Sequence, residues 1–389
     1  MPKLRFPEFR DAPAWQDKQL AKICEMRAGK FVAASAIHEA PAEGLYPCFG
    51  GNGLRGYTKT YTHTGKYPLI GRQGALCGNV TLATGRFHAT EHAVVASPRS
   101  KVDENWLFYL LTRLGLNQYA TGQAQPGLSV ETLKEISACT PIEEEQQKVG
   151  SCLSSIDAVI AAQTQELDAI KAHKNGLMQQ LFPAEGETVP KLRFLQFRNA
   201  PAWQEKRSST LFINRVEEGD AGLPIYSVTM NDGMIRRSLL DRRCDDIAEP
   251  GGNKRAYKDD IAYNMMRMWQ GAFGVASEDC MVSPAYVILG PRDGVCSDFF
   301  AYLLKLPRYL RLLTSHSQGL TADRLRLYYK DFAHISLSVP ALPEQRKIAE
   351  FLSSVDELIA AQTEKLEALK AHKKGLMQQL FPSADEVHG

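Results

Sequence analysis

The segment 51–56 reads GNGLRG, which has the GxGxxG spacing of loops that bind dinucleotide phosphates. Such a loop opens a helix and is followed about 20 residues later by an acidic side chain. Here the chain continues with YTKTYTHTGKYPL, which has no helical period, and 74–78 contain no acid. We therefore favour a Gly-rich turn that brings the backbone close to a nucleic acid, with Arg55 and Tyr57 beside it. A plain hairpin turn is the alternative.

His88 and His92 are four residues apart, a spacing that could hold a metal ion on one face of a helix. Neither an HExxH motif nor a nearby pair of cysteines accompanies them, so we expect no metal. A structural role is the simpler interpretation, and contact with a DNA groove is the functional alternative for His92. The sequence also has no GxxxxGK[ST] loop, no GxSxG elbow and no NPPY-type tetrapeptide of adenine methyltransferases. We expect no catalytic residue and no cofactor.

Basic side chains in the second half of the chain are candidates for DNA contact. The segment GGNKRAYKDD predicts a Gly-led loop that suits phosphate contact through Lys254, Arg255 and Lys258. Arg267 and Trp269 lie in a strand-like run of period 2, and a core position is the alternative for Trp269. In 207–339, Arg outnumbers Lys 13 to 4, and Arg is the side chain that reads guanine with two hydrogen bonds.

Gln73 and Gln270 occupy matching positions in two Gln-Gly-Ala phrases. Glutamine can bond adenine with two hydrogen bonds, but a residue shared by both halves also suits a structural role. A helix expected to start at Thr321 would present its N-terminus, a favourable place for phosphate. The remaining candidates, with a solvated surface as the alternative, are Arg72, Gln125, Tyr286, Arg324 and Arg326.

The elements that must position these residues belong to a module that occurs twice. Residues 2–18, PKLRFPEFRDAPAWQDK, recur as 190–206, PKLRFLQFRNAPAWQEK, with 13 of 17 positions identical. Residues 154–183 recur as 353–382, with 22 of 30 positions identical. A period this long excludes a solenoid, so the chain is two copies of one module.

Between these blocks the two copies diverge, over 19–140 and 207–339. The order variable, shared, variable, shared predicts two copies of one fold with different surfaces. We expect four blocks: a first variable domain in 1–140, a helical spacer in 141–183, a second variable domain in 184–339, and a second helical spacer with a tail in 340–389.

The shared block carries a stripe of mostly apolar residues at a 3.5-residue repeat over more than four heptads, from Val149 to Leu181 and from Ile348 to Leu380. That spacing predicts a helix with a seam on one face, which requires a partner helix. Pro183 and Pro382 end the two helices. Each stripe is about 50 Å long at 1.5 Å per residue.

Because one chain supplies two matching helices, we favour an intramolecular coiled coil over pairing between chains. A two-fold relation between the copies would make the helices antiparallel. Gln163 and Gln362, near the middle of each stripe, either fix the register or are tolerated beside a solvated gap. The expected fold is α+β: two mixed α/β domains, separated by two long helices in an antiparallel coiled coil with pseudo-two-fold symmetry. Such helices would act as a ruler between two sites on a rigid partner.

The composition fits a protein of two or three globular domains, with 389 residues, 44% of them hydrophobic and 23% charged. The net charge of +2 excludes a histone-like binder, although 19–140 alone carry 12 basic and 8 acidic residues. Eight cysteines without a CxxC pair argue against a zinc ribbon and a disulfide framework. There is no signal peptide pattern and no apolar run of 18 residues, so we expect a cytoplasmic protein.

This organisation resembles the specificity subunit of type I restriction–modification enzymes. The resemblance covers essentially the whole chain and rests on the order of blocks, on the heptads, and on a Pro…Glu-Gln opening of each helix at Pro141 and Pro340. It also rests on four phrases in the variable blocks: YPCFGGNGLRGY, GRQGALCG, AYNMMRMWQGAFGV and SPAYVIL.

The resemblance implies that each variable domain is a target recognition domain that reads one half of a bipartite DNA site. It implies that the helices hold two modification subunits, which carry an adenine-N6 methyltransferase, and that separate motor-nuclease subunits complete the restriction enzyme. The chain itself would be non-catalytic. The alternative is a scaffold whose duplicated end domains bind other proteins or sugars.

Overall fold

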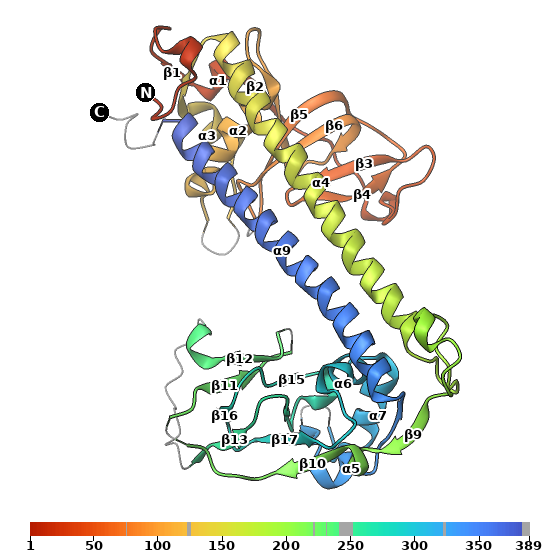
Figure 1. The fold of residues 1–389 in the computed structure, drawn as a ribbon. Helices are drawn as coiled ribbons and strands as arrows, with labels where there is room; N and C mark the ends of the chain where they lie inside the picture. Colours follow the sequence, from red (N-terminus) through yellow and green to blue (C-terminus); the bar gives the residue numbers. More distant parts are fainter. Residues whose placement is uncertain are drawn as a thin grey trace. The chain divides into compact units, whose positions relative to one another are not determined.

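The computed structural model describes residues 1–74, 76–122, 126–220, 222–230, 232–240, 252–321 and 324–382 (Figure 1). The chain forms two compact units. Unit 1 comprises Met1–Gln165 with Thr363–Gly389, and unit 2 comprises Glu166–Gln362. Each unit therefore combines one variable domain with the beginning of the long helix that follows it and with the end of the other long helix.

The two long helices are α4, Glu143–Leu181, and α9, Leu342–Leu380, each of 39 residues. Each is about 58 Å long at 1.5 Å per residue. Both end where the sequence predicts, immediately before the Phe-Pro pairs at 182–183 and 381–382. The expectation of two long helices among mixed α/β elements is confirmed.

The helices pack antiparallel inside each unit. In unit 1, Leu380 of α9 belongs to the same buried cluster as Val149 and Leu153 of α4, while the earlier Lys373 pairs with the later Asp157. Unit 2 repeats the pattern in a cluster that contains Leu181, Ile348 and Leu352. The expected intramolecular antiparallel pairing is therefore present. Gln163 is buried with only 5% of its surface exposed.

A buried ion pair attaches the start of each repeat to the start of its helix. Arg5 donates from Nε and Nη2 to the two oxygens of Glu145, at 2.8 and 2.7 Å, and Trp15 Nε1 donates to the same carboxylate. In unit 2, Arg193 binds Glu344 in the same way, at 2.7 Å for both contacts. This explains why both repeats contain the KLRF phrase and a glutamate in the first turn of the helix.

The adjacent glutamine of each helix closes the same junction. Gln146 Nε2 donates to the Pro141 carbonyl at 3.0 Å, and its Oε1 accepts from the backbone N–H of Asp103. Gln345 makes the equivalent bond to Pro340 at 2.9 Å and accepts from Cys296 N. The Pro…Glu-Gln phrase therefore has a structural role: it ties the first turn of each long helix to its own variable domain.

The variable domain of unit 1 contains a mixed six-stranded sheet, in the order β2-β7-β5-β6-β3-β4, and a two-stranded ribbon of β1 and β8, counted over the described residues. Only β3 and β6 pair in parallel within that sheet. The strands are β1 Gln16–Gln19, β2 Cys24–Ala28, β3 Tyr46–Gly50, β4 Gly53–Thr58, β5 His63–Gly71, β6 Val80–Ala89, β7 Ala93–Pro98 and β8 Ser137–Thr140. The helices are α1 Leu20–Ile23, α2 Glu104–Arg113 and α3 Val130–Glu135.

The variable domain of unit 2 has, in its described part, two four-stranded sheets and a β9–β18 ribbon. Their orders are β10-β17-β14-β15 and β12-β11-β16-β13. The strands are β9 Gln204–Arg207, β10 Phe212–Arg215, β11 Ile225–Val228, β12 Met234–Arg236, β13 Lys254–Ala256, β14 Ile261–Asn264, β15 Phe273–Val275, β16 Cys280–Val282, β17 Tyr286–Pro291 and β18 Ser336–Val339. The helices are α5 Ser208–Leu211, α6 Ser297–Leu304, α7 Pro307–Ser315 and α8 Tyr329–Phe332.

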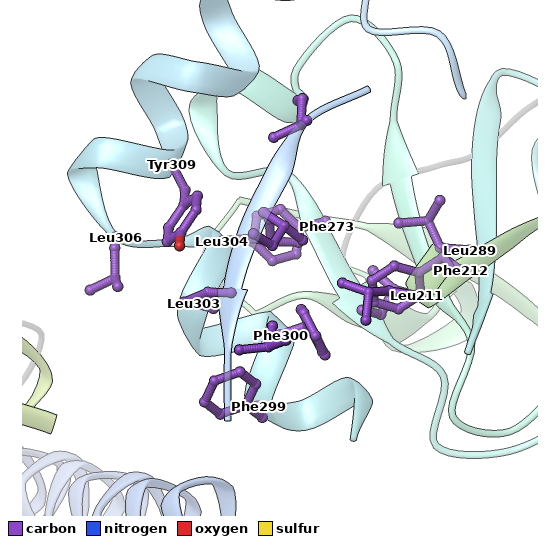
Figure 2. Packing of buried hydrophobic residues seen from close by; sticks show 14 of the residues in the cluster. Leu211, Phe212, Phe273, Leu289, Phe299, Phe300, Leu303, Leu304, Leu306 and Tyr309 are labelled. Atoms are coloured by element: carbon purple, nitrogen blue, oxygen red, sulfur yellow. The ribbon is translucent and has the colours of Figure 1, made fainter. Parts of the chain in front are cut away.

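Aromatic side chains dominate the core of unit 2. Figure 2 shows Phe299 and Phe300 of α6 in one buried cluster with Phe212 of β10 and Phe273 of β15. The Phe212 and Phe300 rings meet edge to face at 5.0 Å, a favourable geometry for aromatic pairs. Because this core joins α6 to the sheet, it holds the turn between β14 and β15 in place.

Two local expectations were wrong. The run around Arg267 is not a strand: β14 ends at Asn264, whose Oδ1 accepts from Met266 N, and a 3-10 turn follows at Met268–Gln270. The chain reverses there because an Asn side chain and Gly271, at φ +89°, favour a turn over continued extension. The loop expected after 251 is partly a strand, β13. The helix start expected at Thr321 falls on a segment whose residues 322–323 lie outside the described residues.

Candidate nucleic-acid interface

A hollow of about 480 Å³ opens on the variable domain of unit 1. It is lined by Gly50, Gly51, Asn52, Gly53, Leu54, Arg55, Gln73, Gly74 and His92. Three of the side chains expected to contact DNA therefore meet here, although they come from three separate segments of the sequence: Arg55, Gln73 and His92.

Glycine makes this meeting possible. A Cβ on Gly71 would lie 2.0 Å from the carbonyl oxygen of Gly51, closer than any side chain tolerates. The absence of side chains at these two positions lets the β3–β4 turn press against the segment after β5. The two Gly-rich phrases of the first variable block are therefore two walls of one hollow.

Arg55 and Gln73 are exposed, and the His92 side chain is 43% exposed. His92 Nε2 lies 3.2 Å from Glu91 Oε1, which orients the ring. Gln73 is held by its backbone through a bridge to Gly127. The exposed Arg55 and Gln73 side chains can thus face a ligand, while the Gln73 backbone is fixed.

Other candidates from this block are tied into the domain. Tyr57 exchanges two backbone hydrogen bonds with His38, both 2.8 Å, and is half-buried. Arg72 is half-buried; its N–H donates to His92 O and its carbonyl accepts from Leu128 N. Gln125 lies outside the described residues.

His88 has the structural role that the sequence suggested. It is 5% exposed, its Nδ1 pairs with Thr60 Oγ1 at 3.0 Å, and its Nε2 pairs with Lys30 O at 3.0 Å. Both ring nitrogens are therefore engaged inside the domain. Within the described residues, no three His, Cys, Asp or Glu side chains gather in a way that could hold a metal ion.

In unit 2, Arg267 and Gln270 are exposed on the turn between β14 and β15. Trp269 is only partly buried, and its Nε1 donates to Met266 O at 3.0 Å. Met268 is the side chain of this turn that enters the core. The core position considered for Trp269 is therefore occupied by the neighbouring Met268.

The two late arginines lie next to that turn. The Leu327 N–H donates to Met265 O at 2.9 Å, which brings the segment carrying Arg324 and Arg326 to the end of β14. Arg326 forms a bridge with Gln318, and both arginines are exposed. In unit 1, the Leu128 N–H donates to Arg72 O at 2.9 Å, and a bridge joins Gln73 to Gly127.

Two of the three cations in the 254–258 segment have partners inside the domain. Lys254 Nζ donates to Tyr286 O at 2.8 Å, and burial lowers the pKa of Lys254. Arg255 pairs with Asp279 at 3.1 Å; their hydrogen bond raises the pKa of Arg255. Tyr286 is fixed as well, since its hydroxyl accepts from Val228 N at 3.4 Å. Lys258 is the exposed cation of the three.

Asn52 is the residue that the sequence analysis missed. It is exposed in the turn between β3 and β4 and lines the hollow beside Arg55. The GGNG phrase gave a signal for the turn, but the contact between that turn and Gln73 depends on segments 20 residues apart in the chain. Local sequence carries no signal for such a contact.

No helix in the described part of the chain is long and apolar enough to cross a membrane.

A family model described as the type I restriction modification DNA specificity domain matches residues 13–172 and 245–371, which is more than half of the chain. The two matched segments fall on the two repeats.

Curated relatives include the type I restriction enzyme EcoprrI specificity subunit of Escherichia coli, 47% identical over 156 residues. That match covers 40% of this chain and 39% of the relative. A putative type I restriction enzyme specificity subunit of Haemophilus influenzae is 26% identical over 119 residues, which are 30% of this chain and 31% of the relative. The chain thus matches less than half the length of these two relatives.

Solved structures show the same fold. The S subunit of a type I restriction–modification system from M. genitalium superposes with a TM-score of 0.69 at 18% identity, covering 98% of this chain and 99% of the other. A chain from a study of assembly and conformational transition in a type I system gives a TM-score of 0.51 at 16% identity, covering 95% and 98%.

Proposed function

The chain belongs to the family of type I restriction–modification DNA specificity domains, and on this premise we propose that it is the subunit that selects the DNA sequence for such a complex. Each variable domain, in the blocks 1–140 and 184–339, binds one half of a bipartite site. The observation that carries the proposal is the duplication itself: the variable blocks diverge in sequence, while 22 of 30 positions in the shared helical block and 13 of 17 in the opening block are identical.

The hollow of unit 1 and the exposed turn of unit 2 supply the groups that groove recognition needs. Exposed Arg and Gln side chains can bond guanine and adenine edges, as in Arg55, Gln73, Arg267 and Gln270. Arg324, Arg326 and Lys258 are exposed cations that suit phosphate contact. These assignments are part of the proposal.

The two helices set the gap between half-sites. A 39-residue helix is stiff, and a 3.5-residue seam keeps the pair in one register. A reader held in this way would leave a fixed number of base pairs without base contact, in the manner of other two-part DNA readers.

Two copies of a modification subunit bind surfaces that occur in both repeats. A partner that is present twice needs two equivalent surfaces. Leu4 and Leu192 are equivalent and each 41% exposed; Val159 and Leu358 are equivalent and 51% and 46% exposed. Apolar side chains that are exposed at the same position in both repeats favour a surface that binds the same partner twice.

Glycines of the helices strengthen this assignment. Gly176 and Gly375 occupy equivalent positions in the interiors of α4 and α9, where an added Cβ would meet open space. A glycine in the interior of a helix lowers helix stability by about 1 kcal/mol relative to alanine. Its presence in both copies therefore indicates a function that needs the absence of a side chain. Close approach of a partner's backbone supplies that reason.

The chain itself is non-catalytic in this proposal. It positions modification subunits that methylate adenine and motor-nuclease subunits that cut, and it acts in the cytoplasm, where the DNA is.

The alternative is a scaffold that binds proteins at its two variable domains. One observation favours it: several arginines of unit 2 already pair with acids, as Arg236 does with Glu278 at 2.6 Å. Salt separates the two functions. A DNA reader loses affinity steeply, by about 10³-fold or more between 50 and 200 mM salt for six or more phosphate contacts. Binding to duplex DNA that is insensitive to salt, or absent, would favour the scaffold.

A further inference from the structure

The hollow of unit 1 brings two side-chain amides together. Asn52 comes from the β3–β4 turn and Gln73 from the segment after β5, and both line the hollow and are exposed. Within the described part of the chain, neither side-chain amide has a hydrogen-bond partner of its own. Two amides left free on a rigid surface are available to a ligand that offers both donors and acceptors.

Four of the nine residues that line the hollow are glycines. At Gly50, Gly51, Gly53 and Gly74 no side chain keeps a planar group away from the amides, and Leu54, Arg55 and His92 complete the lining. The close approach of Gly71 to Gly51 fixes the two walls relative to each other. A hollow of this kind suits the edge of a base pair rather than a flexible chain.

We propose that Asn52 and Gln73 read one A·T pair of the first half-site through hydrogen bonds to its base edge. An amide presents one donor and one acceptor, which match N7 and the N6 amino group of adenine. Arg55 lines the same hollow and supplies positive charge toward the backbone of the bound DNA, and the partly exposed His92 lies beside it as a polar side chain. This inference rests on the proposed function and adds a specificity-determining residue to it.

The test uses the full chain, expressed with its modification partners in a host without other adenine methyltransferases. The methylated motif is sequenced for the wild type, for Asn52→Ala and for Gln73→Ala. We expect each variant to accept other base pairs at one A·T position of the first half-site, with discrimination there reduced about 5- to 160-fold. The second half-site stays as in the wild type. Gln16→Ala, an exposed amide on β1 outside the hollow, keeps the whole motif.

Each other outcome has a defined meaning. If the wild type methylates a two-part motif and Asn52→Ala leaves every position unchanged, or relaxes a G·C position or the second half-site, the inference is overturned and the proposed function stands. If the wild type yields no two-part motif, the proposed function fails and the inference fails with it. If Asn52→Ala abolishes methylation, the isosteric Asn52→Asp decides, because it keeps the shape and removes the donor. A changed position supports the inference, and an unchanged motif overturns it.

Discussion

Lys373 Nζ lies 2.5 Å from Asp157 Oδ1, so an ion pair joins the last turns of α9 to α4 inside unit 1. Tyr109 of α2 donates to the other oxygen of Asp157 at 2.6 Å, and the Lys373 ammonium lies 5.2 Å from the centre of the Tyr109 ring. Unit 2 repeats the arrangement with the equivalent residues Lys174, Asp356 and Tyr302. Each variable domain is therefore fastened to both helices at once.

We predict that Asp157→Asn lowers the free energy of unfolding by about 1–2 kcal/mol, because the Tyr109 bond and the ion pair both lose their charge. The cost stays modest because the Asp157 and Lys373 side chains are 36% and 22% exposed. Urea denaturation measures it. Glu350→Gln breaks a surface pair whose Glu is 71% exposed and should cost less than about 0.5 kcal/mol. Equal costs for the two variants would contradict the fastening role.

The junction between Arg5 and Glu145 should be far more sensitive. The two side chains are 9% and 1% exposed, so Arg5→Gln leaves a buried carboxylate without its cation. We expect a loss of about 3–5 kcal/mol, measured by thermal or urea unfolding. Arg193→Gln should cost the same in unit 2 because Glu344 is equally buried. A loss under about 1 kcal/mol in both variants would show that the junction does not hold the helix start.

Gly71→Ala should damage unit 1 because its Cβ would lie 2.0 Å from Gly51 O. We expect a destabilisation of about 1–3 kcal/mol and a loss of preference in the first half-site only. Gly176→Ala is the matched control for the stability measurement alone: its Cβ meets open space on α4, and alanine should stabilise the isolated chain by up to about 1 kcal/mol. If Gly71→Ala were neutral, the close approach that builds the hollow would not exist in solution.

Removing one heptad from each long helix should shorten the gap between half-sites. Seven residues correspond to about 10.5 Å of helix and so to about 3 base pairs of DNA. We expect the methylated motif to keep both half-sites and to lose about three positions between them. A change of half-site sequence with an unchanged gap would contradict the proposal that helix length sets the gap between half-sites.

Sequence alone predicted what depends on local periodicity. The heptad stripes ending at Leu181 and Leu380 placed both long helices within a few residues, because a 3.5-residue repeat and a final proline are local signals. The duplication then predicted the antiparallel pairing. The Glu-Gln pair of each helix was recognised as a motif, but its bonds to Arg5 and Pro141 required the structure.

Long-range contacts could not be predicted. The hollow depends on Gly51 and Gly71 touching, which no local pattern encodes. The period-2 polarity around Arg267 predicted a strand, but the chain turns there because of the Asn264 side chain and Gly271. Lys254 was expected on a loop for phosphate contact, yet it lies in β13 with its ammonium on Tyr286 O. Tertiary packing decided these positions.

The most direct measurement is single-molecule sequencing of N6-methyladenine in genomic DNA, with and without this gene, in a cell that expresses the modification partner. The account predicts a methylated two-part motif with a fixed gap that disappears when the gene is deleted. An unchanged methylation pattern would contradict it and leave the scaffold function as the better explanation.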